Sequence, residues 1–197
     1  SCRAAYLAGC DGAHSRVREV LGTGFPGGTY SHVFYVADVE ARGEVMNDQL
    51  HVPLDEADFL GVFPLQGGRT ARLIGTVLAE QEADRESLRW EDVGASAARR
   101  LGMRVDKVNW FSTYRVHHRV TSHFSRGRVF LAGDAAHVHS PVGGQGMNTG
   151  IGDAVNLSWK LAEVLRGRAR PAILDSYEPE RIAFAYRLVH TTDRAFV

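Results

Sequence analysis

Apolar positions at the start of the chain are typical of a strand followed by a helix. Residues 3–12, RAAYLAGCDG, form an apolar run that ends in glycines and an acid, which predicts a short buried strand. Residues 13–22 then carry apolar side chains at helical spacing, and Gly22 is placed to end this helix as its C-cap. The face predicted to be buried consists of Val17, Val20 and Leu21.

A second strand and helix follow in the last third of the chain. Residues 127–134, GRVFLAGD, predict another buried strand, and residues 147–167 predict a long amphipathic helix. Residues 170–193 predict a further pair of helices. We expect the apolar face of the long helix to be buried. That face consists of Ile151, Ala154, Val155, Ser158, Leu161, Ala162 and Leu165.

The middle of the chain has a pattern typical of β-strands. From Ser31 to Val77, β-branched and aromatic residues alternate in part with polar ones, and turn-forming stretches interrupt them. A helix is predicted over residues 85–102 and another strand over residues 105–120. About four antiparallel strands are expected in the first block. They are residues 32–41, 49–54, 58–65 and 69–78.

Two strand–helix units therefore bracket an antiparallel block. This order predicts a mixed α/β (α+β) fold in which the chain leaves one domain, builds a sheet and returns. We expect residues 1–28 and 120–197 to form the first domain, and residues 29–119 to form the inserted one.

The composition argues against several classes of function. Lys and Arg together number 23, as do Asp and Glu, and this balance argues against binding to nucleic acid or to a membrane surface by charge. No apolar run reaches the roughly 20 residues that span a bilayer, and no signal peptide is visible. Cys2 and Cys10 have neither zinc-site spacing nor a disulfide framework, so a cytoplasmic protein is expected.

The sequence does not begin with Met and opens directly in a strand-like run. We therefore expect a piece of a longer reading frame, whose isolated sheet would have an unpaired edge and exposed apolar surface. Because such surfaces associate, a homo-oligomer or an aggregate of the isolated chain is one expectation.

A literal GxGxxG stretch, GTGFPG at residues 22–27, does not predict a dinucleotide site. The fingerprint has to follow a strand and open a helix, so that the N–H groups of the helix meet the pyrophosphate. This stretch follows a predicted helix, contains Pro26 and leads into strand-like sequence, so we interpret it as a turn. A genuine fingerprint is absent from the 197 residues.

The stretch GDAAHVHSPVGGQGMNTG, residues 133–150, points instead to a flavin. Asp134 follows a predicted strand at the edge where open α/β sheets bind ligands, and its carboxylate suits sugar-like hydroxyls better than phosphates. The glycines of this stretch allow the backbone to approach a flat ligand closely. The helix that follows would direct its first N–H groups and its positive end at a ring that becomes anionic on reduction.

Two motifs resemble a known family. Residues 127–161, GRVFLAGDAAHVHSPVGGQGMNTGIGDAVNLSWKL, resemble the second FAD motif of the flavoprotein monooxygenases typified by para-hydroxybenzoate and phenol hydroxylases. Residues 6–18, YLAGCDGAHSRVR, resemble the Asp-Gly motif of the same family. The resemblance covers nearly the whole chain. The sequence departs from the family in having Ser140 before Pro141, where many members have Pro-Pro, and in lacking the N-terminal GxGxxG unit that holds the ADP half of FAD.

The resemblance implies a role for each part of the chain. The first domain is a partial FAD-binding, Rossmann-like domain, and the inserted sheet binds substrate. Asp134 binds the ribityl chain, the loop from Pro141 to Gly146 wraps the isoalloxazine, and the Asp-Gly motif lies near the pyrophosphate and is linked to NAD(P)H use. The residues that the resemblance assigns to the cofactor are Asp11, Gly12, Ser15, Arg18, Gly133, Asp134, Ala135, His137, Pro141, Gly143, Gly144, Gln145, Gly146, Met147 and Asn148.

The activity implied is an FAD-dependent, NAD(P)H-consuming hydroxylation of an aromatic, phenol-like compound by O₂, through a flavin hydroperoxide. The sequence supports no particular catalytic acid or base. Two alternatives stay open: another flavin-dependent reaction, such as that of an epoxidase or reductase, or a truncated chain without catalysis. A halogenase is disfavoured because no WxWxIP-like segment occurs.

Other side chains carry weaker signals. His137 and His139 lack the partners of a metal site, so no metal is expected. We interpret His117 and His118 as a solvated or capping cluster, with a contact to substrate or nicotinamide as the alternative. Three aromatic residues are interpreted as core, with the lining of an aromatic-substrate pocket as the alternative. They are Trp110, Phe111 and Tyr114.

Overall fold

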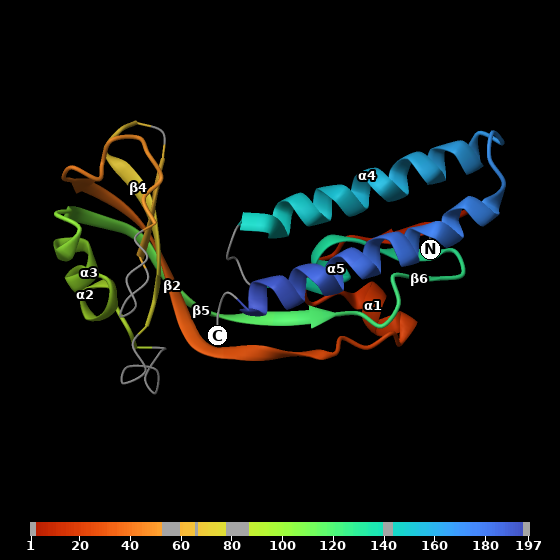
Figure 1. The fold of residues 1–197 in the computed structure, drawn as a ribbon, viewed down its shortest axis with the longest axis horizontal. Coiled ribbons are helices and arrows are strands. Elements are labelled where there is room, and N and C mark those ends of the chain that lie inside the picture. The colour runs from red at the N-terminus through yellow and green to blue at the C-terminus, as the bar shows by residue number, and fades with distance from the viewer. Residues whose placement is uncertain (1–2, 53–59, 66, 78–86, 140–143, 195–197) are drawn as a thin grey trace. The chain divides into compact units, whose positions relative to one another are not determined.

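The computed structural model describes residues 3–52, 60–65, 67–77, 87–139 and 144–194, and Figure 1 shows their helices and strands. The chain divides into two compact units. One comprises residues 1–29 and 117–197, and the other comprises residues 30–116. Helices and strands are mixed in the order expected from the sequence, so the predicted α/β class is confirmed.

A small three-stranded sheet forms the centre of the first unit. Its order is β1-β7-β6, with β1 and β7 parallel and β6 antiparallel to β7. The strands are β1 (Leu7–Gly9), β6 (Ser125–Arg126) and β7 (Val129–Leu131). Both predicted strands are therefore present. The prediction that the first is buried is wrong at Leu7, which is 48% exposed because β1 is an outer strand of this sheet.

The helix after β1 is short and well capped. In α1 (Arg16–Leu21), the N-cap side chain of Ser15 accepts a hydrogen bond from the backbone N–H of Arg18. Gly22 is the C-cap in the left-handed region, at φ 64°, as predicted. The face prediction fails at Val20, which is 74% exposed. GTGFPG joins α1 to a strand and is the turn that was expected.

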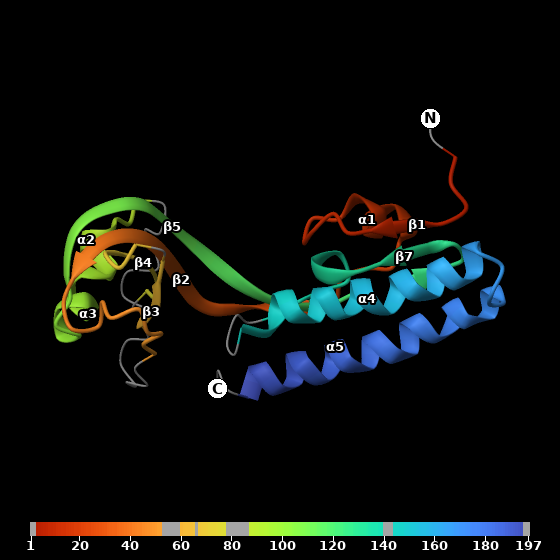
Figure 2. The same cartoon turned by 90° about the horizontal axis from the view of Figure 1, so that it is seen from above.

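Two long helices run side by side in the first unit, as Figure 1 and Figure 2 both show. They are α4 (Gln145–Leu165) and α5 (Tyr177–Arg194), and the 3-10 helix η4 (Pro171–Ser176) precedes α5. Residues 170–193 therefore contain one 3-10 helix and one α-helix. No helix in the described part of the chain is long and apolar enough to cross a membrane.

The predicted buried face of α4 is wrong for most of its residues, although Leu161 is partly buried and packs against the core. Ile151, Val155 and Leu165 are 52%, 61% and 63% exposed. The buried residues of α4 are instead Thr149, Asp153, Leu157 and Lys160. This face is buried because its two charged side chains pair with residues of α5. Asp153 pairs with Arg181, and Lys160 pairs with Glu180. Self-association of the isolated chain stays a prediction.

The second unit is built on an antiparallel sheet. Strands β2 and β5 belong to both units, and the full five-stranded order is β3-β4-β2-β5-β8. The strands are β2 (Gly27–Arg42), β3 (Leu60–Pro64), β4 (Thr70–Thr76), β5 (Arg104–Val120) and β8 (His137–Val138). The strand expected at residues 49–54 is an isolated bridge between His51 and Val62 within the described residues. Parts of the other expected strands lie outside the described residues.

Two short helices stand where the sequence predicted one. They are α2 (Trp90–Val93) and α3 (Ala95–Arg100). Gly94 separates them, and a Cβ atom at this position would lie 1.9 Å from the Trp90 ring. The ring therefore packs against the backbone where the helix breaks. Residues 85 and 86 of the predicted helix lie outside the described residues.

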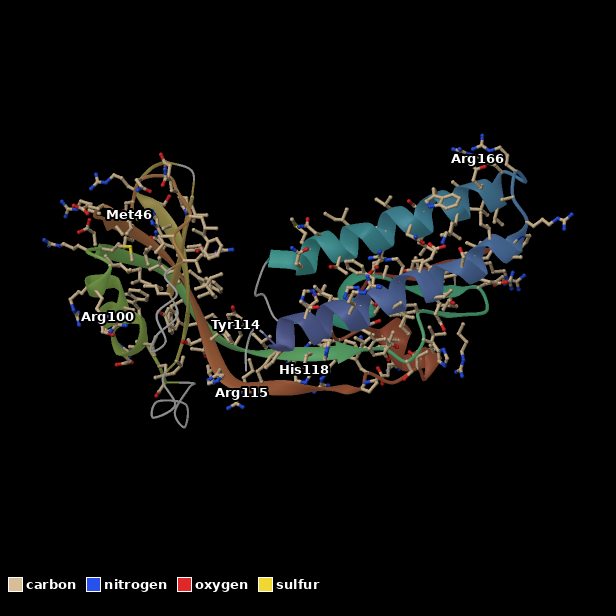
Figure 3. All side chains as sticks on the ribbon, in the orientation of Figure 1. Met46, Arg100, Tyr114, Arg115, His118 and Arg166 are labelled. Atoms are coloured by element: carbon tan, nitrogen blue, oxygen red, sulfur yellow. The ribbon has the colours of Figure 1, made fainter. Side chains whose placement is uncertain are left out.

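Alternate residues of β2 form the core of the second unit with α2 and α3. Phe111 stacks on the buried Tyr35 with ring centroids 6.2 Å apart, so its predicted core position is confirmed. Trp110 is 49% exposed, and its core prediction is wrong. Tyr114, labelled in Figure 3, stacks on Phe34 with ring centroids 5.8 Å apart.

Candidate functional site

Both sequence motifs leave the sheet at the same edge. β1 and β7 are parallel and in register from Leu7 with Val129 to Gly9 with Leu131. The backbone N–H of Ala132 donates to Gly9 O at 3.0 Å, so the pairing extends beyond the strands. The Asp-Gly motif follows β1 and the Gly-Asp motif follows β7. The carboxyl end of parallel strands is where α/β sheets bind ligands.

The Gly133–Asp134 turn presents an unpaired carboxylate. It begins the 3-10 helix η2 (Gly133–Ala135), which the Ala136 N–H closes by donating to Gly133 O at 2.7 Å. Gly133 has φ 59°, a left-handed conformation that glycine adopts without strain. Asp134 is exposed and forms no hydrogen bond or ion pair with the described residues. Its oxygens are therefore available to hydroxyl donors.

The turn packs directly on the second turn of α4. A Cβ atom at Gly150 would lie 3.3 Å from the Cα atom of Gly133. Glycine therefore allows the backbones of the turn and the helix to come together. This contact places the Gly-Asp motif beside the beginning of α4. The sequence analysis did not predict that Gly150 would make this contact.

The beginning of α4 has glycine as its N-cap, so no side chain of that residue caps the helix. Gly144 is the N-cap at φ 62° and makes no side-chain capping bond. The first four N–H groups of a helix have no intrahelical partner and form its positive end. Gln145, Met147 and Asn148 are exposed there. Pro141 and Gly143, also expected at the cofactor, lie outside the described residues.

Asp11 shapes the first turn of α1. Its carboxylate accepts hydrogen bonds from Ser15 Oγ and from the backbone N–H groups of Arg16 at 2.8 Å and Val17 at 3.2 Å. The hydrogen bond from Ser15 is the main reason that the pKa of Asp11 lies below its ordinary value. Gly12 follows with φ 81°. The hydrogen bonds of Asp11 and Ser15 therefore fix both side chains and stabilise the first turn of α1.

Arg18 joins the two motifs. Its guanidinium donates to Ala135 O at 2.9 Å and to Ala13 O at 2.7 Å. The same group lies 3.7 Å above the centroid of the Phe25 ring. Burial lowers the pKa of Arg18. Arg18 thus ties α1 to the turn that carries Asp134.

A buried charged network lies behind the turn. The Asp153 carboxylate is 0% exposed, and its Oδ2 accepts from the Gly133 N–H at 3.0 Å and contacts His137 Nε2 at 2.7 Å. Arg181 Nε donates to Asp153 Oδ1 at 2.6 Å, and its second nitrogen donates to Thr149 O at 3.2 Å. His137, expected at the cofactor, is 2% exposed and holds this network.

Sequence reasoning missed Asp153 and Arg181. Hydropathy oriented α4 by its apolar residues, and the network lies on the opposite face. A signal was nonetheless present, because polar side chains recur along α4 at spacings of four, three and four residues. They are Thr149, Asp153, Asn156 and Lys160.

Basic side chains gather at the C-terminal end of β5, which belongs to the unit of residues 1–29 and 117–197. Burial lowers the pKa of His117, and the charges of Arg119, His14 and His118 lower it further. Arg119 also lowers the pKa of Arg18, and its own Nε is buried without a hydrogen-bond partner among the described residues. Figure 3 labels His118 on this strand. A lowered pKa keeps His117 neutral, so Arg119 is the side chain here that could pair with an anionic ligand.

Comparison with known proteins identifies the family. Residues 1–192 match the sequence profile of the FAD binding domain family. The chain belongs to this family. The resemblance drawn from the two motifs is confirmed, and FAD is the cofactor of the family.

Curated relatives of this chain include several monooxygenases. It is 42% identical over 192 residues to 6-methylpretetramide 4-monooxygenase of Streptomyces rimosus, covering 96% of this chain and 34% of that protein. It is 37% identical over 189 residues to pentachlorophenol 4-monooxygenase of Sphingobium chlorophenolicum, covering 95% of this chain and 35% of that protein. The chain spans about a third of the length of these curated relatives.

Solved structures share the fold of the FAD-binding chain. The flavin-dependent monooxygenase PieE in complex with FAD and substrate matches with a TM-score of 0.82 and 28% identity, over 98% of this chain and 35% of that one. The ternary complex of aklavinone-11 hydroxylase with FAD and aklavinone matches with a TM-score of 0.80 and 28% identity, over 95% and 36%.

The described side chains fit FAD. Asp134 offers free carboxylate oxygens to the hydroxyl groups of a ribityl chain, while its charge would repel a phosphate. The positive end of the α4 dipole favours negative charge beside it. No group of three or more His, Cys, Asp or Glu residues in the described ranges could hold a metal ion.

Proposed function

We propose that this chain is the flavin-binding core of an FAD-dependent, NAD(P)H-consuming monooxygenase that hydroxylates an aromatic, phenol-like compound. The observation that carries the proposal is the free Asp134 carboxylate at the edge of two parallel strands, beside the start of α4. The names of the relatives support the reaction class, since they include 6-methylpretetramide 4-monooxygenase and pentachlorophenol 4-monooxygenase.

Each motif has a separate part in this proposal. Asp134 accepts hydrogen bonds from the ribityl hydroxyls, and the loop from Pro141 to Gly146 wraps the isoalloxazine. The first N–H groups of α4, at Met147 and Asn148, lie beside the pyrimidine side of the ring. The residues assigned to the pyrophosphate side are Asp11, Gly12, Ser15 and Arg18. They act by shaping the start of α1, because the side chains of Asp11, Ser15 and Arg18 are hydrogen-bonded to protein groups.

Bound FAD would supply the redox chemistry, in which two electrons from NAD(P)H and one O₂ yield a hydroxylated ring and water. The protein's share is binding, orientation and electrostatics. The positive end of α4 stabilises negative charge at the ligand, with N–H groups fixed in advance by the helix. The described residues offer no side chain that we assign as acid or base.

The aromatic substrate and NAD(P)H are assigned to different parts of the chain. The antiparallel unit of residues 30–116 binds the aromatic substrate, and Tyr114, which stacks on the buried Phe34, offers an aromatic ring to such a ligand. Arg119, whose Nε is buried without a hydrogen-bond partner among the described residues, offers positive charge to the phosphates of NAD(P)H.

Replacing Asp134 with alanine is expected to weaken FAD binding about tenfold or more, because hydrogen bonds to a charged acceptor are lost. The measurement is flavin content after purification and fluorescence titration of the apoprotein, expressed from its complete reading frame. Asp175→Ala is the matched control, since Asp175 is also an exposed acid after the turn between α4 and α5. Equal flavin affinity in the wild type and Asp134→Ala would refute the assignment.

The reaction class is tested by stoichiometry. With a phenolic substrate, we expect NAD(P)H oxidation, O₂ uptake and hydroxylated product to be equimolar. A reductase would consume NAD(P)H without incorporating oxygen, and an epoxidase would give an epoxide as product. Labelled O₂ followed by mass spectrometry of the product separates both oxygenases from a reductase, and NMR of the product separates a hydroxyl group from an epoxide. An unlabelled product would exclude the hydroxylase.

A further inference from the structure

The network around Asp153 connects three segments to α4. The Gly133 N–H comes from the turn after β7, the His137 ring from β8 and the Arg181 guanidinium from α5. Asp153 is 0% exposed and accepts from all three with its two oxygens. One carboxylate therefore fixes where the turn lies on the helix.

The same network reaches the start of α4. Arg181 also donates to Thr149 O at 3.2 Å, and Thr149 Oγ1 donates to Gln145 O at 2.7 Å. Thr149 is 3% exposed. The first helical turn and the Gly133–Asp134 turn are thus held by one set of buried polar contacts, although Arg181 lies 47 positions after Asp134 in the sequence.

We propose that Asp153, with His137 and Arg181, is a positioning residue that directs the Asp134 carboxylate toward the ribityl chain of FAD. The inference rests on the proposed function. Asp134 has no partner of its own among the described residues, so the backbone of its turn decides where its oxygens point. The Gly133 N–H, one residue away, is held by Asp153 at 3.0 Å. A small rotation of the turn would misdirect the carboxylate.

A double-mutant cycle separates positioning from general stability. We expect Asp153→Asn to raise the FAD dissociation constant about tenfold in the otherwise wild-type protein. In an Asp134→Ala background, the same change is expected to have less than about a twofold effect, because the contact through which Asp153 acts is gone. Affinities are measured by flavin fluorescence on apoprotein, at a temperature where each variant is folded by its melting curve.

The control and a second variant keep the test decisive. Asp175→Asn removes an exposed charge and should leave FAD affinity unchanged. The visible circular dichroism of bound flavin should change in Asp153→Asn and not in the control. If Asp153→Asn does not fold, Arg181→Lys enters the same cycle, since lysine retains a charge for Asp153 and loses the fork that reaches Thr149 O.

The outcomes are distinct. An equal loss of affinity in both backgrounds would show a general loss of fold and overturn the positioning role. So would an Asp153→Asn protein that binds FAD like the Asp175→Asn control. If Asp134→Ala alone leaves FAD affinity unchanged, the assignment under the proposed function is wrong, and the inference falls with it.

Discussion

Replacing Arg181 with methionine is expected to lower the free energy of unfolding by about 3–5 kcal/mol at neutral pH. Arg181 Nε donates to Asp153 Oδ1 at 2.6 Å, and the Asp153 carboxylate is 0% exposed. Without the guanidinium, the carboxylate loses the one partner in the network that is always charged. Methionine fills a similar volume and supplies no donor, so the loss reflects the buried charge more than packing.

The pH dependence has a definite sign. Burial opposes ionisation of Asp153, but hydrogen bonds from His137, Arg181 and Gly133 outweigh it, so its pKa lies below the ordinary 3.8. A carboxyl with a lowered folded pKa contributes stability above its unfolded pKa, and this contribution is lost as pH falls through the folded value. In Arg181→Met, one of the hydrogen bonds that lower this pKa is lost, so the folded pKa rises. The carboxyl then contributes less stability at neutral pH than in the wild type, and the difference shrinks as acid protonates the carboxyl in both proteins.

Urea unfolding at pH 7 and at pH 4 measures both effects. The difference between wild type and Arg181→Met should be larger at pH 7. Arg187→Met is the matched control, because Arg187 is an exposed arginine on the same helix, and its effect should stay within about 0.5 kcal/mol. A loss in Arg181→Met no greater than that of the control would show that the ion pair does not stabilise the fold.

The order of the helices and strands could be predicted from the sequence because each element depends mainly on residues close to it in the chain. The apolar run of residues 127–134 forms β7, and the glycine predicted to end the first helix is its left-handed C-cap, Gly22. Each depends on a few neighbouring residues. The two motifs come together because both follow parallel strands. The sequence predicted those strands without their register, and it wrongly predicted that the first of them is buried.

The orientation of α4 was not accessible from hydropathy. Periodicity assigns the more apolar face to the core, yet Val155 is 61% exposed while Lys160 is 1% exposed. Lys160 Nζ donates to Glu180 Oε2 at 2.7 Å, and that contact is the main reason that the pKa of Glu180 falls to about 2. Partners on α5 decide which face of α4 is buried. The hydropathy pattern of α4 alone contains no information about those partners.

The role of Asp11 illustrates the same limit at the site. Its position in the Asp-Gly motif predicted a place near the cofactor, and nothing in that motif showed that both oxygens would be used on α1. Asp134 differs because no N–H or hydroxyl group of the described residues bonds to it. Two acids at equivalent strand ends therefore have different chemical availability, which follows from the turn after each strand.

Replacing Gly27 with alanine is expected to cost about 3 kcal/mol or more, from backbone strain and a steric clash together. Gly27 begins β2 with φ 141°, a conformation that is essentially restricted to glycine. A Cβ atom there would lie 1.9 Å from His118 O and 2.7 Å from Arg119 Cα on β5. The obstacle is backbone, so it has no flexible side chain that could move aside.

Gly67→Ala separates the two costs. Gly67 has φ 115°, and a Cβ atom there would meet nothing within 4 Å, so alanine at this position adds backbone strain without the clash. Urea unfolding should therefore show a larger loss for Gly27→Ala than for Gly67→Ala. Equal losses would mean that β2 and β5 separate at little cost. A larger loss at Gly27 would explain the last glycine of GTGFPG by the close approach of two strands, with no nucleotide involved.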